Sequence, residues 1–376
     1  MSNFYNFEEI KNTPSPSLLY YRNIIQQNID TAISITKSKN SLWPHIKSHK
    51  MPNVIRLSIS NGITRFKCAT ISEAEIAATC GATDVLLAYP IIGPNIKRFL
   101  NLRIAFPQTH FYAIGDNIES IYLLSNLQKD CPVHTDLFID INLGMNRTGV
   151  PLENLEKFIE KCKEIPGISI VGFHCYDGHQ TDSDPIIRKK KIHEMSKKLK
   201  KILDCIIIKN PNYANIIIGG SPSFPYLVDE WKNDVHYTTY FSPGTVFIYD
   251  YGYQKKYPDL PFFPGAAILT RVVSHPNDAL FTIDCGYKSI ASDPPGPKAF
   301  LLGVDNYEEC FQSEEHWTFR MKKGYEKERP PIGKELFLLP THICPTSALY
   351  NHAIVIDNKH IVAQWPITAR NRFLLY

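Results

Sequence analysis

A single amine lies between two imidazoles in Trp43-Pro-His-Ile-Lys-Ser-His-Lys50, where Lys47 follows His45 and precedes His49. In an extended chain side chains alternate between two faces, so these three side chains are expected on one face. A lysine that points inward from a strand is costly to bury with its charge. It usually has a partner, a lowered pKa or a covalent role such as a Schiff base. The alternative is a solvated basic turn after Pro44.

An apolar run ends in two glycines and two hydroxyls in Ile216-Ile-Ile-Gly-Gly-Ser-Pro-Ser223. Gly219 and Gly220 allow backbone amides to converge on an anion, and Ser221 and Ser223 can add hydrogen bonds to phosphate oxygens. The pattern favours a phosphate site, and the alternative is an ordinary turn between a strand and a helix.

Two further segments place polar side chains at the ends of expected strands. Arg147 lies beside glycines in residues 140–149, where it can donate to an oxygen or nitrogen of a bound ring or pair with Asp140. Residues 172–180 hold two histidines, a tyrosine and an aspartate. Such a density of titratable groups suits acid–base chemistry, and the alternative is a hydrogen-bonded polar loop.

His342 and Cys344 are two residues apart in Pro340-Thr-His-Ile-Cys-Pro345, so on a strand both would face one side. Imidazole and thiolate together are typical zinc ligands. Two protein ligands are few for a structural zinc site, which leaves a catalytic ion with open positions for water and substrate. The alternative is a chance pairing in a chain with 13 histidines and nine cysteines.

The elements that must position these residues follow two patterns. Up to about residue 245, eight short apolar runs alternate with helical patterns such as 72–79 and 152–163, which predicts an α/β fold of the (β/α)8 TIM-barrel type. The eight expected strands are residues 41–47, 65–69, 84–88, 110–113, 136–142, 168–175, 215–218 and 237–241. Chemistry in such barrels gathers at the C-terminal ends of the strands, where Lys47, Arg147, His174 and Gly219 fall.

The second pattern begins after about residue 245, where apolar runs follow one another without helices between them. These runs are residues 266–273, 279–283, 299–304, 335–339, 352–356 and 360–365. We therefore expect a barrel over 15–245 and a β domain over 246–376 that includes 1–14 and carries the His342 and Cys344 pair.

Composition narrows the class of partner. A net charge of +4, from 41 basic and 37 acidic residues, gives no global field for nucleic acid or membranes. The lysines between residues 188 and 201 fall opposite an apolar stripe, as on the solvated face of an amphipathic helix. Nine cysteines without a CxxC pair suit reduced thiols. We expect a soluble cytoplasmic protein with a small-molecule substrate.

Taken together, these segments resemble the D-threonine aldolase and D-serine dehydratase family of fold type III pyridoxal phosphate (PLP) enzymes, which share the alanine racemase-like barrel. The matching segments are 44–50, 84–90, 145–149, 176–179, 219–223, 243–245, 284–288, 315–316 and 341–346. They keep the family's order over nearly the whole chain.

The resemblance implies a set of site residues. It implies PLP bound to Lys47 with His45 beside it, a phosphate held by Gly219, Gly220 and Ser221, Arg147 near the ring and Tyr176 close to the cofactor. It also implies a divalent metal, zinc by the chemistry of the pair, on His342 and Cys344, and a homodimer.

The resemblance leaves the reaction between two lyase types. In a dehydration Lys47 takes the α proton of a D-3-hydroxy amino acid such as D-serine while the metal helps hydroxide depart. In a retro-aldol cleavage a base, for which His179 is the candidate, takes the hydroxyl proton. Cys344 resembles the dehydratases, whereas Tyr176-Asp-Gly-His179 is closer to the aldolases. The alternatives are an amino-acid racemase, which needs a second base opposite Lys47 and no metal, and a non-catalytic PLP-binding protein.

Overall fold

The computed structural model describes residues 2–129, 134–293 and 295–373. They divide into two compact units. The barrel unit comprises Ala32–Lys47, Val54–Gly244 and Asn371–Tyr376, and the β unit comprises Met1–Thr31, Ser48–Asn53 and Thr245–Arg370. Among the described residues, no helix combines the length and apolarity needed to cross a membrane.

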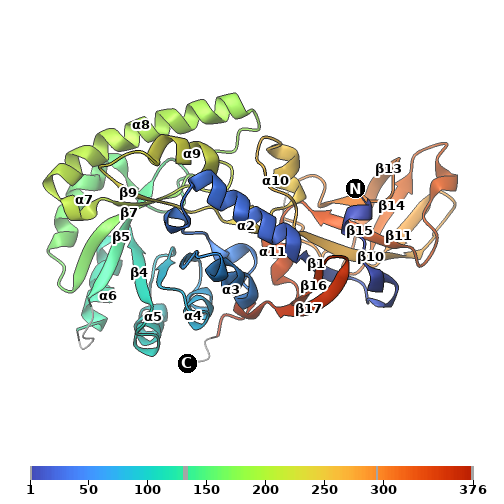
Figure 1. Ribbon diagram of the computed structural model, residues 1–376, viewed down its shortest axis with the longest axis horizontal. Coiled ribbons are helices and arrows are strands. Elements are labelled where there is room, and N and C mark those ends of the chain that lie inside the picture. Colours follow the sequence, from blue (N-terminus) through green and yellow to red (C-terminus); the bar gives the residue numbers. More distant parts are fainter. Residues whose placement is uncertain (1, 130–133, 294, 374–376) are drawn as a thin grey trace. The chain divides into compact units, whose positions relative to one another are not determined.

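The barrel unit is built on seven parallel strands in the order β2-β3-β4-β5-β7-β8-β9 (Figure 1). They are β2 (Arg65–Cys68), β3 (Asp84–Leu87), β4 (His110–Gly115), β5 (Thr135–Asn142), β7 (Ile168–Cys175), β8 (Asn215–Ile218) and β9 (Thr238–Phe241), and the short β6 (Val150–Pro151) pairs with β5. Residues 42–45 bridge both edges of this sheet, through Leu42 to Phe241 of β9 and through His45 to Lys67 of β2. These bridges close the ring of strands.

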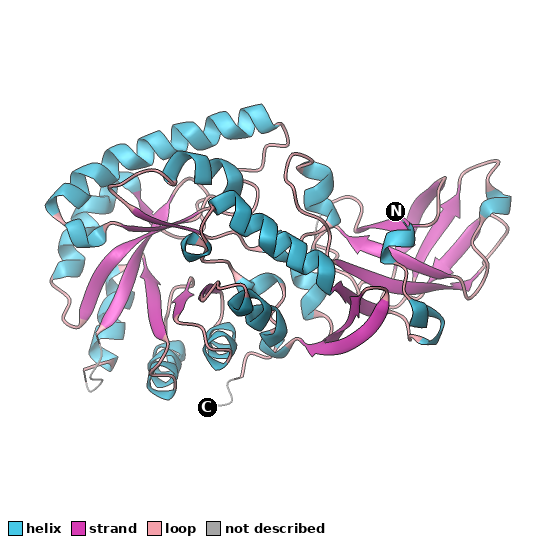
Figure 2. Cartoon of the chain, viewed as in Figure 1, coloured by secondary structure: helices cyan, strands magenta, loops and turns pink. Residues whose placement is uncertain are grey.

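Helices follow the strands and lie outside them, as Figure 2 shows. They are α4 (Ile71–Thr79), α5 (Pro94–Ala105), α6 (Ile118–Leu127), α7 (Leu155–Lys163), α8 (Pro185–Lys209) and α9 (Phe224–Trp231), while α2 (Arg22–Thr36) and α3 (Pro52–Ser60) have residues in both units. Helix α4 begins with a reciprocal cap: the Thr70 hydroxyl accepts from the Glu73 amide and the Glu73 carboxylate accepts from the Ala69 amide. The cap fixes the chain directly after β2.

An apolar cluster fills the inside of the barrel. Its buried members are Trp43, Leu86, Ile114, Phe138 and Ile217. Residues two apart along an extended segment lie on the same face. His45, Asp140 and Gly219 therefore follow Trp43, Phe138 and Ile217 towards the C-terminal ends of the strands. The polar site therefore lies directly on an apolar floor.

The β unit holds a nine-stranded sheet with the main order β13-β14-β11-β10-β1-β16-β17, in which β15 pairs with β10 and β12. Its strands are β1 (Ser17–Tyr21), β10 (Ala266–Ser274), β11 (Leu280–Ile283), β12 (Ala299–Leu302), β13 (Tyr307–Gln312), β14 (Trp317–Met321), β15 (Glu335–Pro340), β16 (His352–Asp357) and β17 (His360–Pro366). Its helices are α1 (Ser2–Tyr5), α10 (Tyr251–Lys256) and α11 (Ile343–Ala348). Most pairs are antiparallel, but β1 and β16 are parallel.

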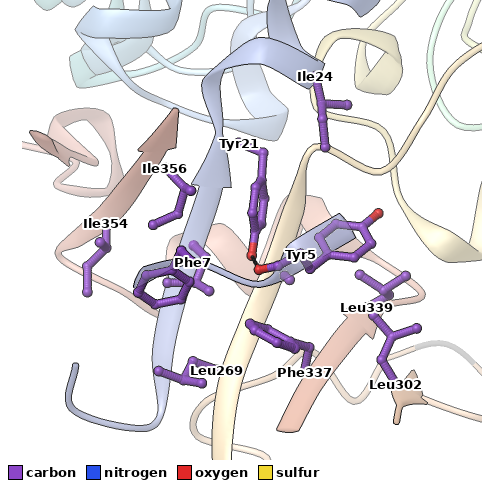
Figure 3. Close-up of a cluster of buried hydrophobic side chains, with 12 residues drawn as sticks. Tyr5, Phe7, Tyr21, Ile24, Leu269, Leu302, Phe337, Leu339, Ile354 and Ile356 are labelled. Atoms are coloured by element: carbon purple, nitrogen blue, oxygen red, sulfur yellow. Dashed lines mark hydrogen bonds between the residues drawn. The ribbon is translucent and has the colours of Figure 1, made fainter. Parts of the chain in front are cut away.

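The core of the β unit joins residues from both ends of the chain. Figure 3 shows Tyr5, Tyr21, Leu269 and Phe337 packed in one cluster, where the Tyr21 hydroxyl donates to the backbone oxygen of Tyr5 at 2.5 Å. Residues near position 5 and position 337 thus belong to one hydrophobic core, and the N-terminal segment is an integral part of this unit.

The expected barrel with an added β domain is confirmed, with three differences in detail. The first expected strand, residues 41–47, is not a strand: it forms isolated bridges and then the 3₁₀ helix η3 (Ile46–Ser48). The compact β unit extends to Thr31, beyond the expected boundary at residue 15, because β1 pairs with β10 and β16. Strands β13 and β14 were not expected from the sequence, and Cys131 lies outside the described residues.

Candidate active site

Lys47 lies at the end of the segment that closes the barrel. Because residues 46–48 turn into a 3₁₀ helix, the expected alternation of His45, Lys47 and His49 on one face of a strand is wrong. The two histidines are instead bound to the backbone: His45 Nδ1 accepts from the Lys47 amide at 3.3 Å, and His49 Nδ1 accepts from the Met51 amide at 3.1 Å. Burial lowers the pKa of His49 to about 3, so this imidazole is neutral.

The glycine segment forms a cradle after β8. Gly219 has φ +91°, and a Cβ there would lie 2.4 Å from Leu227 Cδ1, so the position requires glycine. A Cβ on Gly220 would lie 3.2 Å from Tyr176 Cε2. The Gly244 amide donates to the Ser221 hydroxyl at 3.3 Å, which joins the ends of β8 and β9. In parallel barrels the loops after these last strands are the usual phosphate site.

The side chain of Lys47 lies close to the glycine cradle. A Cβ on Gly244 would lie 3.5 Å from His45 Cβ and 3.9 Å from Lys47 Cε. The structure therefore brings the two separate sequence motifs, 43–50 and 216–223, to one point through Gly244. The absence of a side chain at Gly244 leaves that space open between them.

Three cations converge on the ring of Tyr176. Lys47 Nζ lies 5.7 Å, Lys67 Nζ 5.4 Å and Arg147 Cζ 5.0 Å from the ring centroid. They outnumber the two nearby carboxylates, those of Asp140 and Asp177. Such an excess of positive charge suits an anionic ligand.

A series of hydrogen bonds joins several buried side chains of the candidate site. Thr148 donates to Asp140 Oδ2 at 2.8 Å, Asp140 Oδ1 lies 2.7 Å from His174 Nδ1, and His174 Nε2 lies 3.5 Å from Lys67 Nζ. Burial alone would raise the pKa of Asp140, but the bonds from His174 and Thr148 hold it below its usual value. Asp140 is thus engaged by His174 and Thr148, and Arg147 contacts Tyr176.

Lys67 is the functional candidate that sequence reasoning missed. Arg65-Phe-Lys-Cys68 shows no glycine or histidine signature, and the only available signal was strand alternation, which sets Lys67 on one face with Arg65. Lysine is rarely buried, and here the residue is 2% exposed.

The loop after β7 holds polar atoms without partners. The Asp177 side chain is 1% exposed, and its carboxylate lies near Ser223 and the Gly220 amide without reaching hydrogen-bond geometry. Burial raises its pKa, and these neighbours oppose the rise. His179 Nε2 lies 3.1 Å from Gln180 Nε2, while His179 Nδ1 is buried without a partner.

Two cavities open beside this loop. One of about 20 Å³ is lined by Asp140, Arg147, Thr148, His174 and Tyr176, among others. The other, of about 370 Å³, shares Asn142 and Leu143 with it and extends to Gln180 and Lys198. The small cavity is thus lined by Arg147 and Tyr176, the two side chains that were expected near a bound ring.

In the β unit the His342 and Cys344 pair lies at the start of α11. The expectation of a strand is wrong here, because β15 ends at Pro340 and His342 is the N-cap of α11. His342 Nδ1 lies 2.6 Å from Asp293 Oδ2, and Cys344 Sγ lies 3.6 Å from Thr245 Oγ1. Burial lowers the pKa of His342, but contacts with Cys344 and Asp293 overcome it and raise the value to about 9.

Asp250 holds this helix in place. Its carboxylate accepts from the Tyr253 amide at 2.8 Å and from the Ile343 amide at 3.1 Å, so it caps α10 and the first residue of α11 together. Burial raises its pKa to about 6. The bond to Ile343 fixes the residue that lies between His342 and Cys344.

The residues present fit PLP better than they fit a closed metal site. The glycine cradle, the Lys47 amine and the excess of cations match a phosphorylated aldehyde. For a metal, the described residues contain no cluster of three or more His, Cys, Asp or Glu ligands. The pair of His342 and Cys344 nevertheless has Asp293 beside His342 Nδ1, in the position of the outer carboxylate at many metal sites. It fits an ion completed by water and substrate.

Comparison with known families agrees with the fold. Residues 22–216, more than half of the chain, match the model described as alanine racemase, N-terminal domain. The chain belongs to the alanine racemase N-terminal domain family. Residues 265–356 match the model described as "Putative serine dehydratase domain". The relationship expected from the motifs is therefore confirmed.

Similar proteins of this family are aldolases and dehydratases. D-threonine aldolase of Arthrobacter sp. is 22% identical over 336 residues, 88% of this chain and 85% of that protein. 3-Hydroxy-D-aspartate aldolase of Paracoccus denitrificans (strain Pd 1222) is 26% identical over 339 residues, 87% and 84% of the two chains. D-serine dehydratase of Dictyostelium discoideum is 22% identical over 407 residues, 94% and 96%. The expected enzyme class, a lyase, agrees with all three.

Solved structures show the same fold. D-threonine aldolase from Filomicrobium marinum has a TM-score of 0.83 at 23% identity, covering 96% of both chains. D-threo-3-hydroxyaspartate dehydratase from Delftia sp. HT23 has a TM-score of 0.80 at 16% identity, covering 95% of this chain and 98% of that one. Alanine racemase of Clostridium difficile 630 is more distant, with a TM-score of 0.70 at 12% identity and coverage of 94% and 99%.

Proposed function

We propose that this protein is a PLP-dependent lyase that acts on a D-3-hydroxy amino acid, with the cofactor bound covalently to Lys47. One observation carries the proposal. A Cβ on Gly244 would lie 3.9 Å from Lys47 Cε, and the Gly244 amide donates to Ser221 of the glycine cradle, which supports a single site for the amine and the phosphate. The aldolase and dehydratase relatives, which align with both units, support the reaction class.

The side chains of the barrel then have distinct roles. Bound PLP would draw electron density away from the Cα of the substrate. Gly219, Gly220 and Ser221 hold the phosphate, and His45 fixes the backbone amide of Lys47. Arg147 and Tyr176 line the small cavity and orient the ring. The amine of Lys47 would accept the α proton of the substrate.

His342 and Cys344 would hold a divalent metal, and zinc suits one nitrogen and one thiolate. The ion would supply Lewis acidity towards the β-hydroxyl of the substrate. Asp293 fixes the ring of His342 so that Nε2 remains for the metal. His179, whose Nδ1 has no partner, is the proposed base for the hydroxyl proton if the Cα–Cβ bond is cleaved.

The two lyase reactions can be distinguished by their products. Dehydration gives a 2-oxo acid and ammonia, whereas retro-aldol cleavage gives glycine and an aldehyde or oxo acid. The decisive experiment is a panel of D-serine, D-threonine, D-allo-threonine and D-3-hydroxyaspartate, assayed for ammonia, aldehyde or glyoxylate, and racemised product. Racemised product without ammonia or aldehyde would support the racemase alternative. Absence of turnover with every substrate would support a non-catalytic PLP-binding protein.

We also propose an oligomeric state and a cellular location for the protein. A homodimer in the cytoplasm is expected from the family resemblance and from cysteines without a CxxC pair. Light scattering of the purified chain measures its mass in solution, and a monomer at working concentration would contradict the assembly. Cell fractionation with an antibody to the chain tests the location.

A further inference from the structure

Lys67 is a buried amine that the proposed reaction does not use. It lies on β2 inside the barrel, and its backbone bridges to His45 on the segment that carries Lys47. Its Nζ is 3.5 Å from His174 Nε2 and 5.4 Å from the centroid of the Tyr176 ring. Lys67 therefore lines the candidate cofactor site from inside the barrel.

The imidazole of His174 is arranged to accept from this amine. Burial lowers the pKa of His174, so the ring is neutral and carries one N–H. Because Asp140 is held ionised, that N–H faces Asp140 from Nδ1, and Nε2 is left as an acceptor towards Lys67. The accepting nitrogen orients the amine without neutralising it.

The charged and titratable groups around Lys67 lie on several neighbouring segments. They are Lys47 on η3, Asp140 on β5, Arg147 after β5, His174 on β7 and Asp177 after β7. Burial, and then Lys47 and Arg147, lower the pKa of Lys67, while Asp177 and Asp140 oppose them, and together they bring the pKa from 10.5 to about 7. The amine is thus poised between its neutral and charged forms, and a new anion nearby would favour the charged form.

We propose that Lys67 is a cofactor-positioning residue whose amine takes up a proton when a phosphorylated pyridine binds in this site, so that the ammonium holds the anionic ligand by charge. The inference rests on the proposed function, because it needs the same site to bind PLP. A purely structural lysine would need a permanent partner, and the neutral His174 nitrogen does not supply opposite charge.

The sign of the pH dependence follows from linkage. Below the pKa of Lys67 in the free protein the amine is already charged, so binding needs no proton and affinity is highest. As pH rises through that value, binding must be accompanied by protonation, and affinity falls by up to about tenfold per pH unit. Above the higher pKa of the complex, the contribution of Lys67 is lost.

The test uses full-length protein freed of cofactor and pyridoxine 5′-phosphate, which lacks the aldehyde and cannot bond to Lys47. Calorimetric affinities are measured from pH 6 to pH 10 for wild type, Lys67→Met, Lys67→Arg and the control Lys200→Met. Lys200 also lies over an aromatic ring, 4.7 Å from the centroid of Trp231, but on α8. Ionisation of the ligand is common to all four proteins and cancels in the affinity ratios.

We expect wild type to bind pyridoxine 5′-phosphate at least about tenfold more tightly than Lys67→Met at pH 6. The ratio of the two affinities should fall towards one at high pH. Lys67→Arg keeps its charge, so it should match wild type at pH 6 and exceed it at pH 9, while Lys200→Met follows wild type throughout. The melting temperature of cofactor-free Lys67→Met at pH 6 should not fall, because the variant removes a buried charge.

Two results would overturn the proposal: equal affinities of wild type and Lys67→Met at all pH values, or a ratio of the two affinities that does not vary with pH. If Lys67→Met does not fold, Lys67→Arg still reports whether the ratio to wild type varies with pH. Failure of the proposed function looks different, because wild type would then bind neither PLP nor pyridoxine 5′-phosphate.

Discussion

At the scale of single residues, the proposed site depends on one amine and on two glycines that would make room for a phosphate. Lys47 is positioned by a 3₁₀ turn and not by a strand, and the cradle is reached through Gly244. This arrangement makes Lys47 and Gly220 the two positions where a substitution has the most direct effect on cofactor binding.

Substitution of Lys47 tests the covalent linkage. Lys47→Ala should lose the visible absorbance of bound PLP, because no other residue is proposed to form the imine. Turnover should fall on the order of a thousandfold or more, since acid–base contributions alone amount to ~10²–10⁴. Borohydride reduction of wild type followed by peptide mapping identifies the labelled lysine. Label on the peptide that holds Lys67 would move the assignment there.

Substitution of Gly220 tests the phosphate cradle. A Cβ at this position would lie 3.2 Å from Tyr176 Cε2 and 3.5 Å from Asp177 Oδ1, so Gly220→Val forces both side chains to move. The dissociation constant for PLP should rise about tenfold or more, which corresponds to ~1.4 kcal/mol. Fluorescence titration measures this constant, and the melting temperature of the cofactor-free variant serves as control. Unchanged affinity would leave the segment as an ordinary turn.

At the scale of elements, short helices decide the geometry of both candidate sites. The 3₁₀ helix η3 carries Lys47, and α11 carries Cys344 directly after its N-cap His342. Asp250 ties α11 to α10 by accepting from the Ile343 amide. The proposed metal pair is therefore held at the start of a helix.

Chelation and substitution of Cys344 test the metal. Removal of divalent ions with a chelator should abolish lyase turnover and leave the PLP absorbance intact, because the ion acts on the substrate oxygen. Cys344→Ala should behave in the same way, and Cys344→Asp should regain part of the activity with manganese, which prefers oxygen ligands. Cys310→Ala, at an exposed cysteine of β13, is the matched control. Full turnover by metal-free protein would rule out metal assistance.

At the scale of the whole molecule, each compact unit is assembled from separated segments of the chain. In the β unit, β1 lies between β10 and β16, although some 250 residues separate it from β10 in sequence. Its residues Leu18, Leu19, Tyr20 and Tyr21 are all at most 3% exposed. The N-terminal strand is thus central to this sheet.

Removal of residues 1–21 tests this dependence. Burial of four such side chains stabilises a fold by roughly 6–12 kcal/mol at about 1.5–3 kcal/mol each, which is comparable with the ~5–15 kcal/mol stability of a whole domain. The shortened chain should therefore lose the β unit, as measured by circular dichroism and urea unfolding. Arg22→Ala, which removes an exposed ion pair to Asp357, should change the unfolding free energy by less than ~1 kcal/mol. Native-like unfolding of the shortened chain would contradict the central role of β1.

The sequence by itself determined the class of fold and supplied most of the residues of the proposed site. Strands β7 and β8 have the expected bounds, because an apolar run between turn residues is a local signal. The glycine cradle was also readable, since a positive φ at Gly219 needs glycine whatever surrounds it. The tertiary structure decided the rest. Nothing local indicates that β1 joins a sheet formed mostly after residue 265, and the local pattern at residues 46–48 left a strand and a turn both open. Lys67 has no local signature either, and only the closure of the barrel buries it against His174 and gives its amine a pKa near 7.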